Sequence, residues 1–253
     1  MLPLAPFIHK IHKAVVLFVG AVFVIGTLCN ISAFPFDSSA PLKVFFKQTV
    51  DLDNQTNSVI LEGVPMYLRH PIIDEIPSSV NKAWCSDQSI RPLLYSCRWP
   101  GLVPNVAGDK YRSSPDLSSL IKFTVKRDGS AAVFTIKGRN TRNCRIYFDQ
   151  PIFYANVRGS AEGLQRGYEM GPEGVTVVKL WSRTWDREFV VDVGLGSSVL
   201  SSKKFTGKVA CEWAENIDDR IPALEEIITF IPKWAVATKA DDGLVEAYYK
   251  FEI

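Results

Sequence analysis

The sequence predicts a mainly β protein, in which one N-terminal transmembrane helix precedes an antiparallel β-sandwich-like domain with a C-terminal α-helix. Three features carry this prediction: an uncharged apolar run, a series of segments that alternate apolar and polar residues, and a final segment with helical spacing. An aromatic content of 11% suits a packed β-rich domain. The net charge of only +2 is too small to attract a polyanion, so no nucleic-acid partner is expected.

The apolar run covers residues 14–36 and contains no charged side chain. It exceeds the roughly 20 residues that cross a hydrocarbon core. Basic residues precede it at Lys10, His12 and Lys13, and the first one after it is Lys43. The positive-inside rule therefore predicts a cytosolic tail at 1–13 and a luminal domain at 37–253. A cleaved signal peptide with an apolar core at 14–28 is the alternative, but the apolar length favours a retained anchor.

Four cysteines lie in the exported region and a fifth, Cys29, lies in the apolar run. The four are Cys85, Cys97, Cys144 and Cys211. An even number in an oxidising compartment predicts two disulfides, with three connectivities open. We favour Cys85–Cys97, which would close a short loop, and Cys144–Cys211, which would bridge strands. A zinc site is the weaker alternative, because there is no C-x-x-C motif and no histidine near the four.

Residues 43–52 and 58–62 predict two strands joined by a polar turn. The turn holds the sequon Asn54-Gln55-Thr56, so glycosylation of Asn54 is expected if this side is luminal. Residues 63–118 contain seven prolines, which break long elements, so we expect loops held by the Cys85–Cys97 bridge.

Six further segments predict strands, and the first three of them alternate apolar and polar residues. These are residues 120–127, 131–137, 144–149, 174–181, 187–193 and 208–213. Asp128-Gly129 marks a hairpin turn between the first two. The first three segments therefore predict an antiparallel meander with one wet face and one buried face.

The spacing changes near the C-terminus. Leu224, Ile227, Ile228 and Ile231 fall on one helical stripe, and Pro232 stops the helix. Asp218 or Asp219 is expected to cap it, with Pro222 in the first turn. Residues 244–253 then predict a closing edge strand.

The exported region offers little catalytic chemistry. His70 is its single histidine, whereas serine and cysteine nucleophiles of the usual kind need a histidine base, and a two-metal site needs more ligands. The adjacent acidic pairs, such as Asp241-Asp242, point apart and are read as capping and surface charges. No catalytic or metal-binding residue is predicted.

One polar–aromatic cluster stands out between two predicted strands. It comprises Trp181, Arg183, Trp185, Asp186 and Arg187. Two tryptophans and two arginines in one turn could bind a ligand by stacking and charge. The alternative is a structural corner in which Arg183 or Arg187 pairs with Asp186. The corner is favoured, because it requires no ligand.

Several runs resemble one known family. They are FPF at 34–36, LKVFFKQTVDL at 42–52, LWSRTWDRE at 180–188, IPALEE at 221–226 and DDGLVE at 241–246. Together they resemble the C-terminal region of fungal vacuolar membrane proteases, members of the zinc aminopeptidase-like family. The resemblance covers the last transmembrane span and the luminal C-terminal domain only. It implies a place in the vacuolar membrane, and zinc as a cofactor of the parent family but not of this chain, because the zinc ligands lie in the peptidase domain.

The function expected from these observations is a non-catalytic, membrane-anchored luminal accessory domain. Its partners would be the membrane and the peptidase domain of a larger protease. One alternative is a functional zinc-dependent membrane peptidase of which this chain is a fragment. Another is a carbohydrate- or peptide-binding β-sandwich module that uses Trp181 and Trp185.

Overall fold

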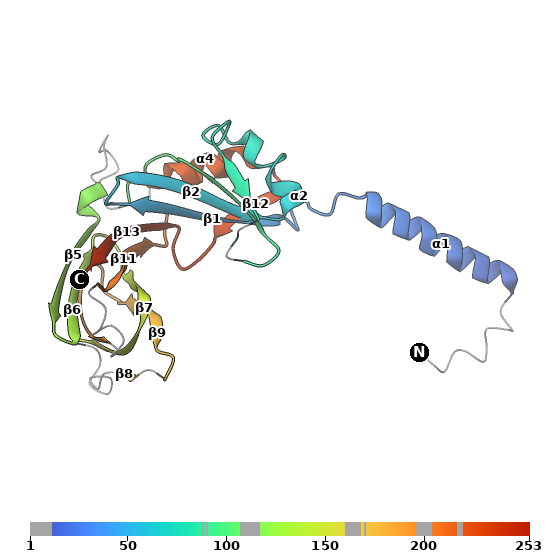
Figure 1. Cartoon of the computed structure of the whole chain (residues 1–253). Helices are drawn as coiled ribbons and strands as arrows, with labels where there is room; N and C mark the ends of the chain where they lie inside the picture. The colour runs from blue at the N-terminus through green and yellow to red at the C-terminus, as the bar shows by residue number, and fades with distance from the viewer. Residues whose placement is uncertain are drawn as a thin grey trace.

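The computed structural model describes residues 12–253 except 88, 90, 107–116, 160–167, 170, 196–203 and 217–219. Helix α1 (Lys13–Ser32) is 20 residues long, and none of its residues is buried. It projects from the domain as a separate rod (Figure 1). The length and composition of α1 are those of a membrane span. It ends four residues before the predicted boundary, because Ala33 is already extended and Pro35 follows.

Among the described residues, thirteen strands form one sheet, and this corrects the predicted antiparallel sandwich. The sheet runs in the order β3-β4-β2-β1-β13-β11-β7-β10-β6-β5, with β12 beside β1 and with β8 and β9 beside β7. It is mixed, since β1 (Leu42–Asp51) lies parallel to β12 (Ala235–Lys239) and β13 (Val245–Glu252). Alternation cannot separate the two architectures, because strands have two faces in both.

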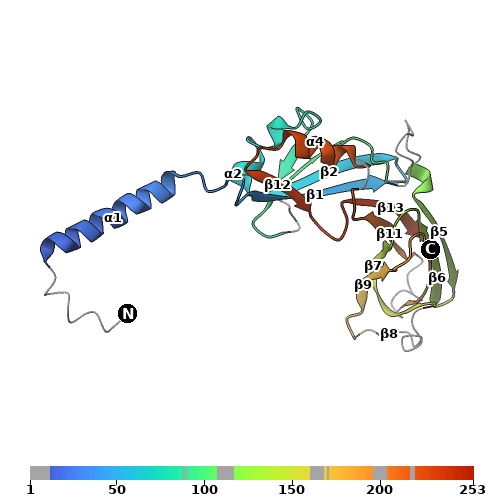
Figure 2. The same cartoon turned by 180° about the vertical axis from the view of Figure 1, so that it is seen from behind.

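The other ten strands lie between β1 and β12 in the sequence. They are β2 (Thr56–Gly63), β3 (Trp84–Ser86), β4 (Tyr95–Trp99), β5 (Ile121–Asp128), β6 (Ala131–Gly138), β7 (Asn143–Val157), β8 (Tyr168–Glu169), β9 (Val175–Trp181), β10 (Glu188–Leu195) and β11 (Thr206–Trp213). The short helices are α2 (Pro65–Leu68), α4 (Pro222–Phe230) and the 3-10 turns Ile73–Glu75 and Leu117–Ser119. Strands β1 and β2 extend toward α1, while β5, β6, β7 and β9 curl at the opposite end (Figures 1 and 2).

The predicted hairpins form, but the predicted meander does not. β1 pairs with β2, and β5 pairs with β6 around Gly129, whose φ is +57°. β10 lies between β6 and β7, so the third segment does not follow its neighbour in the sheet. In the connection after Gly138, Thr141 Oγ1 donates to the Glu212 carbonyl at 2.5 Å, and β7 then pairs with β11.

The C-terminal elements differ from the prediction in two ways. α4 begins at Pro222, and its N-cap is Ile221, which makes no side-chain cap; Asp218 and Asp219 lie outside the described residues. β13 is not an edge strand, because it lies between β1 and β11. The long pairing with β11 buries Val245 and Ala247, so the final strand is central to the sheet.

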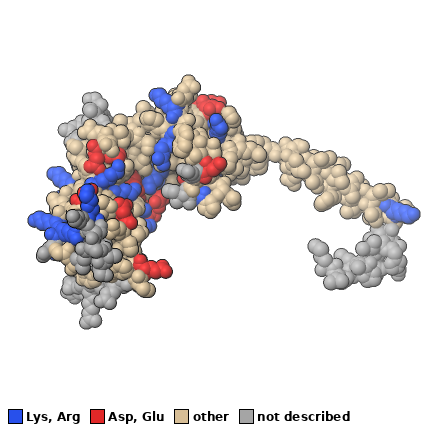
Figure 3. Space-filling model, in the orientation of Figure 1, with Lys and Arg blue, Asp and Glu red and all other residues tan. Residues whose placement is uncertain are grey.

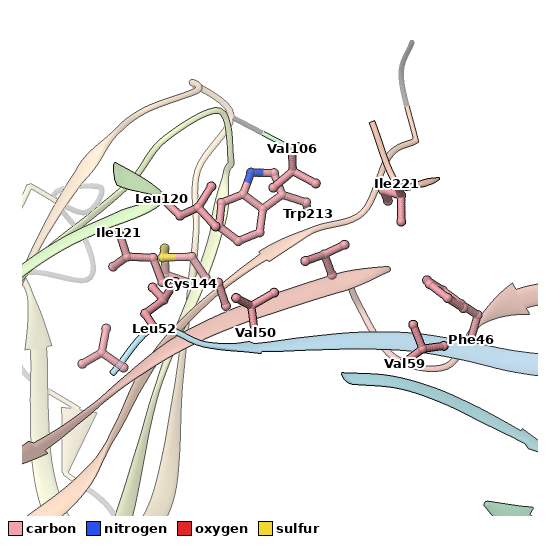
Figure 4. Close-up of a cluster of buried hydrophobic side chains, with 14 of the residues drawn as sticks. Phe46, Val50, Leu52, Val59, Val106, Leu120, Ile121, Cys144, Trp213 and Ile221 are labelled. Carbon is pink, nitrogen blue, oxygen red and sulfur yellow. A yellow bond between two sulfur atoms is a disulfide. The ribbon is translucent and has the colours of Figure 1, made fainter. Parts of the chain in front are cut away.

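The buried apolar side chains form one continuous core. Figure 4 shows a part of it, where Phe46, Val50 and Val59 of β1 and β2 lie near Trp213 and Ile221. Farther along the sheet, the rings of Phe134 and Phe251 pack edge to face with centroids 5.0 Å apart. The core therefore joins the β1–β2 end to the curled end, and the whole sheet acts as one support for the opposite, polar face.

Candidate functional site

Three neighbouring strands carry charged side chains on the face opposite the core. β7 pairs with β11, and β11 pairs with β13, so directly opposed residues share a face. Cys144 and Ile146 of β7 are buried in the core, which places Arg145 on the other side. We call this side the charged face. Its members on the three strands are Asn143, Arg145, Tyr147, Lys208, Glu212 and Glu246.

The Arg145 guanidinium is the first centre of this face. The side chain is buried, its Nη1 lies 3.0 Å from Asp241 Oδ2, and its Nη2 contacts Asp242 and lies 3.1 Å from Glu212 Oε2. Nη1 also donates to the Tyr147 hydroxyl at 3.2 Å. The Arg145 guanidinium therefore forms ion pairs with three carboxylates, two of which lie in the loop that leads into β13.

Glu246 is the second centre. Its side chain is 2% exposed and accepts from Lys47 Nζ at 2.8 Å and from Lys208 Nζ at 3.0 Å. The Tyr147 hydroxyl donates to the same carboxylate at 3.3 Å and links the two centres. Burial alone would raise the pKa of Glu246, but the two lysines outweigh it and lower this pKa.

Glu212 lies between the two centres and has one unpartnered oxygen. Its Oε2 accepts from Asn143 Nδ2 at 2.6 Å and pairs with Arg145, whereas its Oε1 has no hydrogen-bond partner among the described residues. Burial raises the pKa of Glu212 to about 7. Arg145 opposes this shift only in part, because its charge is shared with Asp241 and Asp242.

A pocket of about 390 Å³ opens beside Glu212, where β7, β9 and β11 begin or end. Trp181 and Trp185 form part of its wall and remain 63% and 44% exposed. Its polar and charged lining includes Asn140, Arg142, Asn143, Lys179, Glu215, Lys239 and Asp242. Exposed indole faces beside hydrogen-bonding groups can stack on a ring and bind its polar substituents.

The corner between β9 and β10 is built differently from the prediction. No ion pair joins Asp186 to Arg183 or Arg187, all of which the structure describes. Instead, Asp186 adopts φ +55°, its Oδ1 accepts from the Asn140 backbone N–H at 2.5 Å, and its own N–H donates to the Thr141 carbonyl at 3.1 Å. The corner is thus held to residues 140–141, just before β7, by one hydrogen bond to the Asp186 side chain and one between backbone groups.

The two arginines of the predicted cluster do not line the pocket. Arg187 Nη2 donates to the Gly159 carbonyl at 2.8 Å and holds the end of β7, while Arg183 is exposed. The arginine that stacks on a tryptophan is instead Arg142. Its guanidinium carbon lies 4.6 Å from the Trp185 ring centroid, and its Nη2 pairs with Glu215. Trp181 and Trp185 therefore line the pocket, and the cation beside Trp185 comes from another segment than the two predicted arginines.

Both disulfides join residues that lie directly opposite each other on neighbouring strands. Cys85 of β3 faces Cys97 of β4, and Cys144 of β7 faces Cys211 of β11. These are the two pairings that the sequence analysis favours, and Cys29 is a free thiol on α1. Asn54 is exposed in the turn after β1, at the end of the strand that points away from α1.

Across the parts of the chain that the structure describes, no group of three or more His, Cys, Asp or Glu residues is arranged to hold a metal ion. The acidic side chains that do gather, Glu212, Glu246, Asp241 and Asp242, are instead interleaved with lysine and arginine. Such an arrangement braces neighbouring strands, and sequence reasoning did not detect it, because polar residues on alternate positions indicate a solvated face.

A family model described as the vacuolar membrane protease C-terminal domain matches residues 42–247. The vacuolar membrane protease of Schizophyllum commune is 41% identical over 100% of this chain and 28% of its own length. Those of Laccaria bicolor and Aspergillus oryzae are 37% and 38% identical over 99% of this chain, and over 30% and 25% of their own lengths.

The chain thus spans less than a third of each of these relatives. A solved structure, the folded domain of the Mycobacterium tuberculosis LppM protein, is 11% identical over 67% of this chain and 97% of its own, with a TM-score of 0.20, so it bears on neither fold nor function. The family match covers the sheet from the first residue of β1 into β13. The chain therefore belongs to the vacuolar membrane protease C-terminal domain family.

Proposed function

We propose that this chain is a non-catalytic, membrane-anchored accessory domain that supports or positions the peptidase region of a larger vacuolar membrane protease. The observation that carries the proposal is the match of residues 42–247 to a C-terminal domain that makes up less than a third of its relatives. The charged face supports it as well, since its carboxylates are engaged by lysine and arginine within the sheet.

The proposed location is the vacuolar membrane, with one span at α1. Basic residues before α1 and none until Lys43 favour a cytosolic N-terminus and a luminal domain. Two disulfides support the luminal side, because disulfides persist in oxidising compartments.

A deletion in a full-length relative tests the accessory role. Removing the region that matches residues 42–253 from the Schizophyllum commune protease should lower that protein's abundance or peptidase activity. Unchanged abundance, location and activity would overturn the proposal. The rival reading, that this chain itself carries zinc peptidase activity, is tested on the purified full chain: stoichiometric zinc together with aminopeptidase turnover would establish the rival.

A second candidate function, carbohydrate or peptide binding, is favoured by the exposure of Trp181 and Trp185 in the wall of the pocket. Replacing either residue with alanine should abolish binding of oligosaccharides or peptides, measured by titration calorimetry on the full chain. The free energy of unfolding should change by less than about 1 kcal/mol, as for other surface substitutions. Trp99→Ala is the matched control, because Trp99 is buried and its loss should cost about 3–5 kcal/mol without removing a pocket residue.

A further inference from the structure

Four aromatic rings gather where α1 joins the domain. Phe34 and Phe36 of the connecting segment pack against Tyr67 of α2 and Trp234, which precedes β12. Ring centroids lie 4.9 Å apart for Phe34–Trp234, 5.2 Å for Phe36–Tyr67 and 6.0 Å for Tyr67–Trp234. Edge-to-face pairs at these separations attract. The connecting segment is therefore fastened to the domain within four residues of the end of α1.

The residues around this cluster leave apolar surface exposed. Phe34 is 52% exposed although it contacts three rings, and Met66, beside Tyr67, is 76% exposed. Other exposed apolar side chains close to the cluster in sequence are Val64, Phe230 and Val236. α1 leaves the domain beside α2 and β12 in both views (Figures 1 and 2), and the connecting segment itself is mostly uncharged on the face that Figure 3 shows.

Exposed basic residues border the same end of the domain. Arg69 follows α2, Lys233 precedes Trp234, and Lys43 lies opposite Val236 in the β1–β12 register. The same stretches also carry the exposed acids Asp37, Asp74 and Glu75. The end thus combines an apolar centre, amphipathic aromatic rings and a charged border that includes three basic residues. That is the composition of protein surfaces that sit at a membrane–water boundary, where rings lie at headgroup level and lysine or arginine meets lipid phosphate.

The length of α1 sets how far this surface lies from the bilayer. Twenty helical residues span about 30 Å, the thickness of the hydrocarbon core. Ser32 then lies at the boundary of that core, and Phe34, two residues on, lies within about 7 Å of it. Because the aromatic cluster fixes the connecting segment, the domain has little freedom to lift its apolar end away from the lipid.

We propose that this end of the domain, formed by Phe34, Met66 and their exposed neighbours, docks on the lipid surface of the leaflet that α1 crosses. The apolar side chains enter the headgroup boundary, and Lys43, Arg69 and Lys233 contact anionic headgroups. The proposal rests on the proposed anchoring by α1. It goes beyond that anchoring because it assigns the folded domain itself a membrane-binding surface and a fixed orientation.

A fluorophore placed at Met66 tests the docking. The full chain carries Cys29→Ser and Met66→Cys, is labelled at the new cysteine, and is reconstituted into phosphatidylcholine–phosphatidylserine vesicles that contain nitroxide-labelled lipid. Lys126→Cys in the same background is the control, because Lys126 is exposed on β5 at the end opposite α1. The Met66 label should lose most of its fluorescence to the nitroxide lipid, whereas the Lys126 label should keep its own.

The native thiol separates failure of docking from failure of anchoring. In the unmodified chain, Cys29 lies within α1 and should resist a water-soluble maleimide once α1 crosses the bilayer. Protection of Cys29 with no quenching at Met66 would overturn the docking proposal alone, and free reaction of Cys29 would overturn the anchoring as well. A Met66 label that stays unquenched in vesicles but is shielded in native fungal membranes would assign the surface to a protein partner and also overturn the proposal.

Discussion

The charged face predicts that two adjacent carboxylates contribute to stability with opposite dependence on pH. Glu246→Gln removes the charge between Lys47 and Lys208, which lie 2.8 and 3.0 Å from the carboxylate. Removing one partner of a buried ion pair costs about 3–5 kcal/mol. Lys208 is 36% exposed and can turn to water, whereas Lys47 is 15% exposed, so we expect the lower figure, about 3 kcal/mol near neutral pH.

The direction of the pH effect follows from the lowered pKa of Glu246, a shift that the two lysines impose against the effect of burial. A lowered folded-state pKa stabilises the fold above the unfolded pKa, near 4.5, and this contribution is lost as the pH falls through the folded-state value. The deficit of Glu246→Gln should therefore be full at pH 7 and should shrink in strongly acidic solution.

Glu212→Gln is the matched variant, because Glu212 lies directly opposite Glu246 in the β11–β13 register and is equally buried. Its folded-state pKa of about 7 means that the folded chain keeps a proton that the unfolded chain releases between pH 4.5 and 7. Stability therefore falls as the pH rises through this window, by about 3 kcal/mol at most. Glutamine mimics the protonated form, so Glu212→Gln should gain stability relative to the native chain above pH 7.

Urea unfolding of the full chain in non-ionic detergent, followed by tryptophan fluorescence, measures both variants at pH 5 and pH 8. The free energy of unfolding of Glu246→Gln should fall below that of the native chain at both values. The difference between Glu212→Gln and the native chain should become more favourable from pH 5 to pH 8. The reasoning fails if Glu212→Gln gains no stability relative to the native chain from pH 5 to pH 8, or if Glu246→Gln costs less than about 1 kcal/mol at pH 8.

Three further predictions use the same unfolding assay or simple electrophoresis. A disulfide that closes a longer loop restricts the unfolded chain more and so stabilises the fold more. Loss of the Cys144–Cys211 disulfide, whose residues are 67 apart, should therefore lower the free energy of unfolding by about 4 kcal/mol, and loss of Cys85–Cys97, 12 apart, by about 3 kcal/mol. Equal losses would contradict this dependence on loop length. Gly207→Ala should cost about 1–3 kcal/mol, since the new methyl would lie 2.2 Å from the Tyr147 carbonyl oxygen; an unchanged midpoint would refute that contact. Asn54→Gln should abolish the mobility shift that a glycosidase causes, and a persistent shift would place the glycan elsewhere.

The individual strands were predictable because the signals for them are local. Alternation and Asp128-Gly129 are enough for the β5–β6 hairpin, and the polar turn is enough for β1–β2. The order of strands in the sheet is not local. β13 pairs with β1 through Val245 and Gln48, which lie far apart in the chain, and β10 enters between β6 and β7. No short-range pattern specifies those neighbours, so the single mixed sheet was not predicted.

The candidate site was predictable only in its aromatic part. Trp181 ends β9 and Trp185 lies in the turn that follows, and the structure places both in the pocket wall. Arg145 and Glu246 occupy polar positions of alternating strands, where the pattern indicates solvent. Both are buried among long side chains: Tyr147 contacts Arg145 and Glu246, and Lys47 contacts Glu246 from β1. Which side chains pack around these charges depends on the order of the strands. Because the sequence does not reveal that order, it does not reveal that the charges are buried.

Some residues belong both to the pocket and to the ion pairs of the charged face, and this limits which substitutions can test ligand binding by the pocket. Lys179 and Asp242 line the pocket, yet they pair with each other at 3.0 Å, and Asp242 also contacts Arg145. Removing Asp242 would therefore disturb a contact of the buried Arg145 as well as the pocket, and removing Lys179 would leave Asp242 without its lysine partner. Trp181 and Trp185 are exposed and belong to the pocket without joining the ion pairs. They are the residues whose replacement can separate loss of binding from loss of stability.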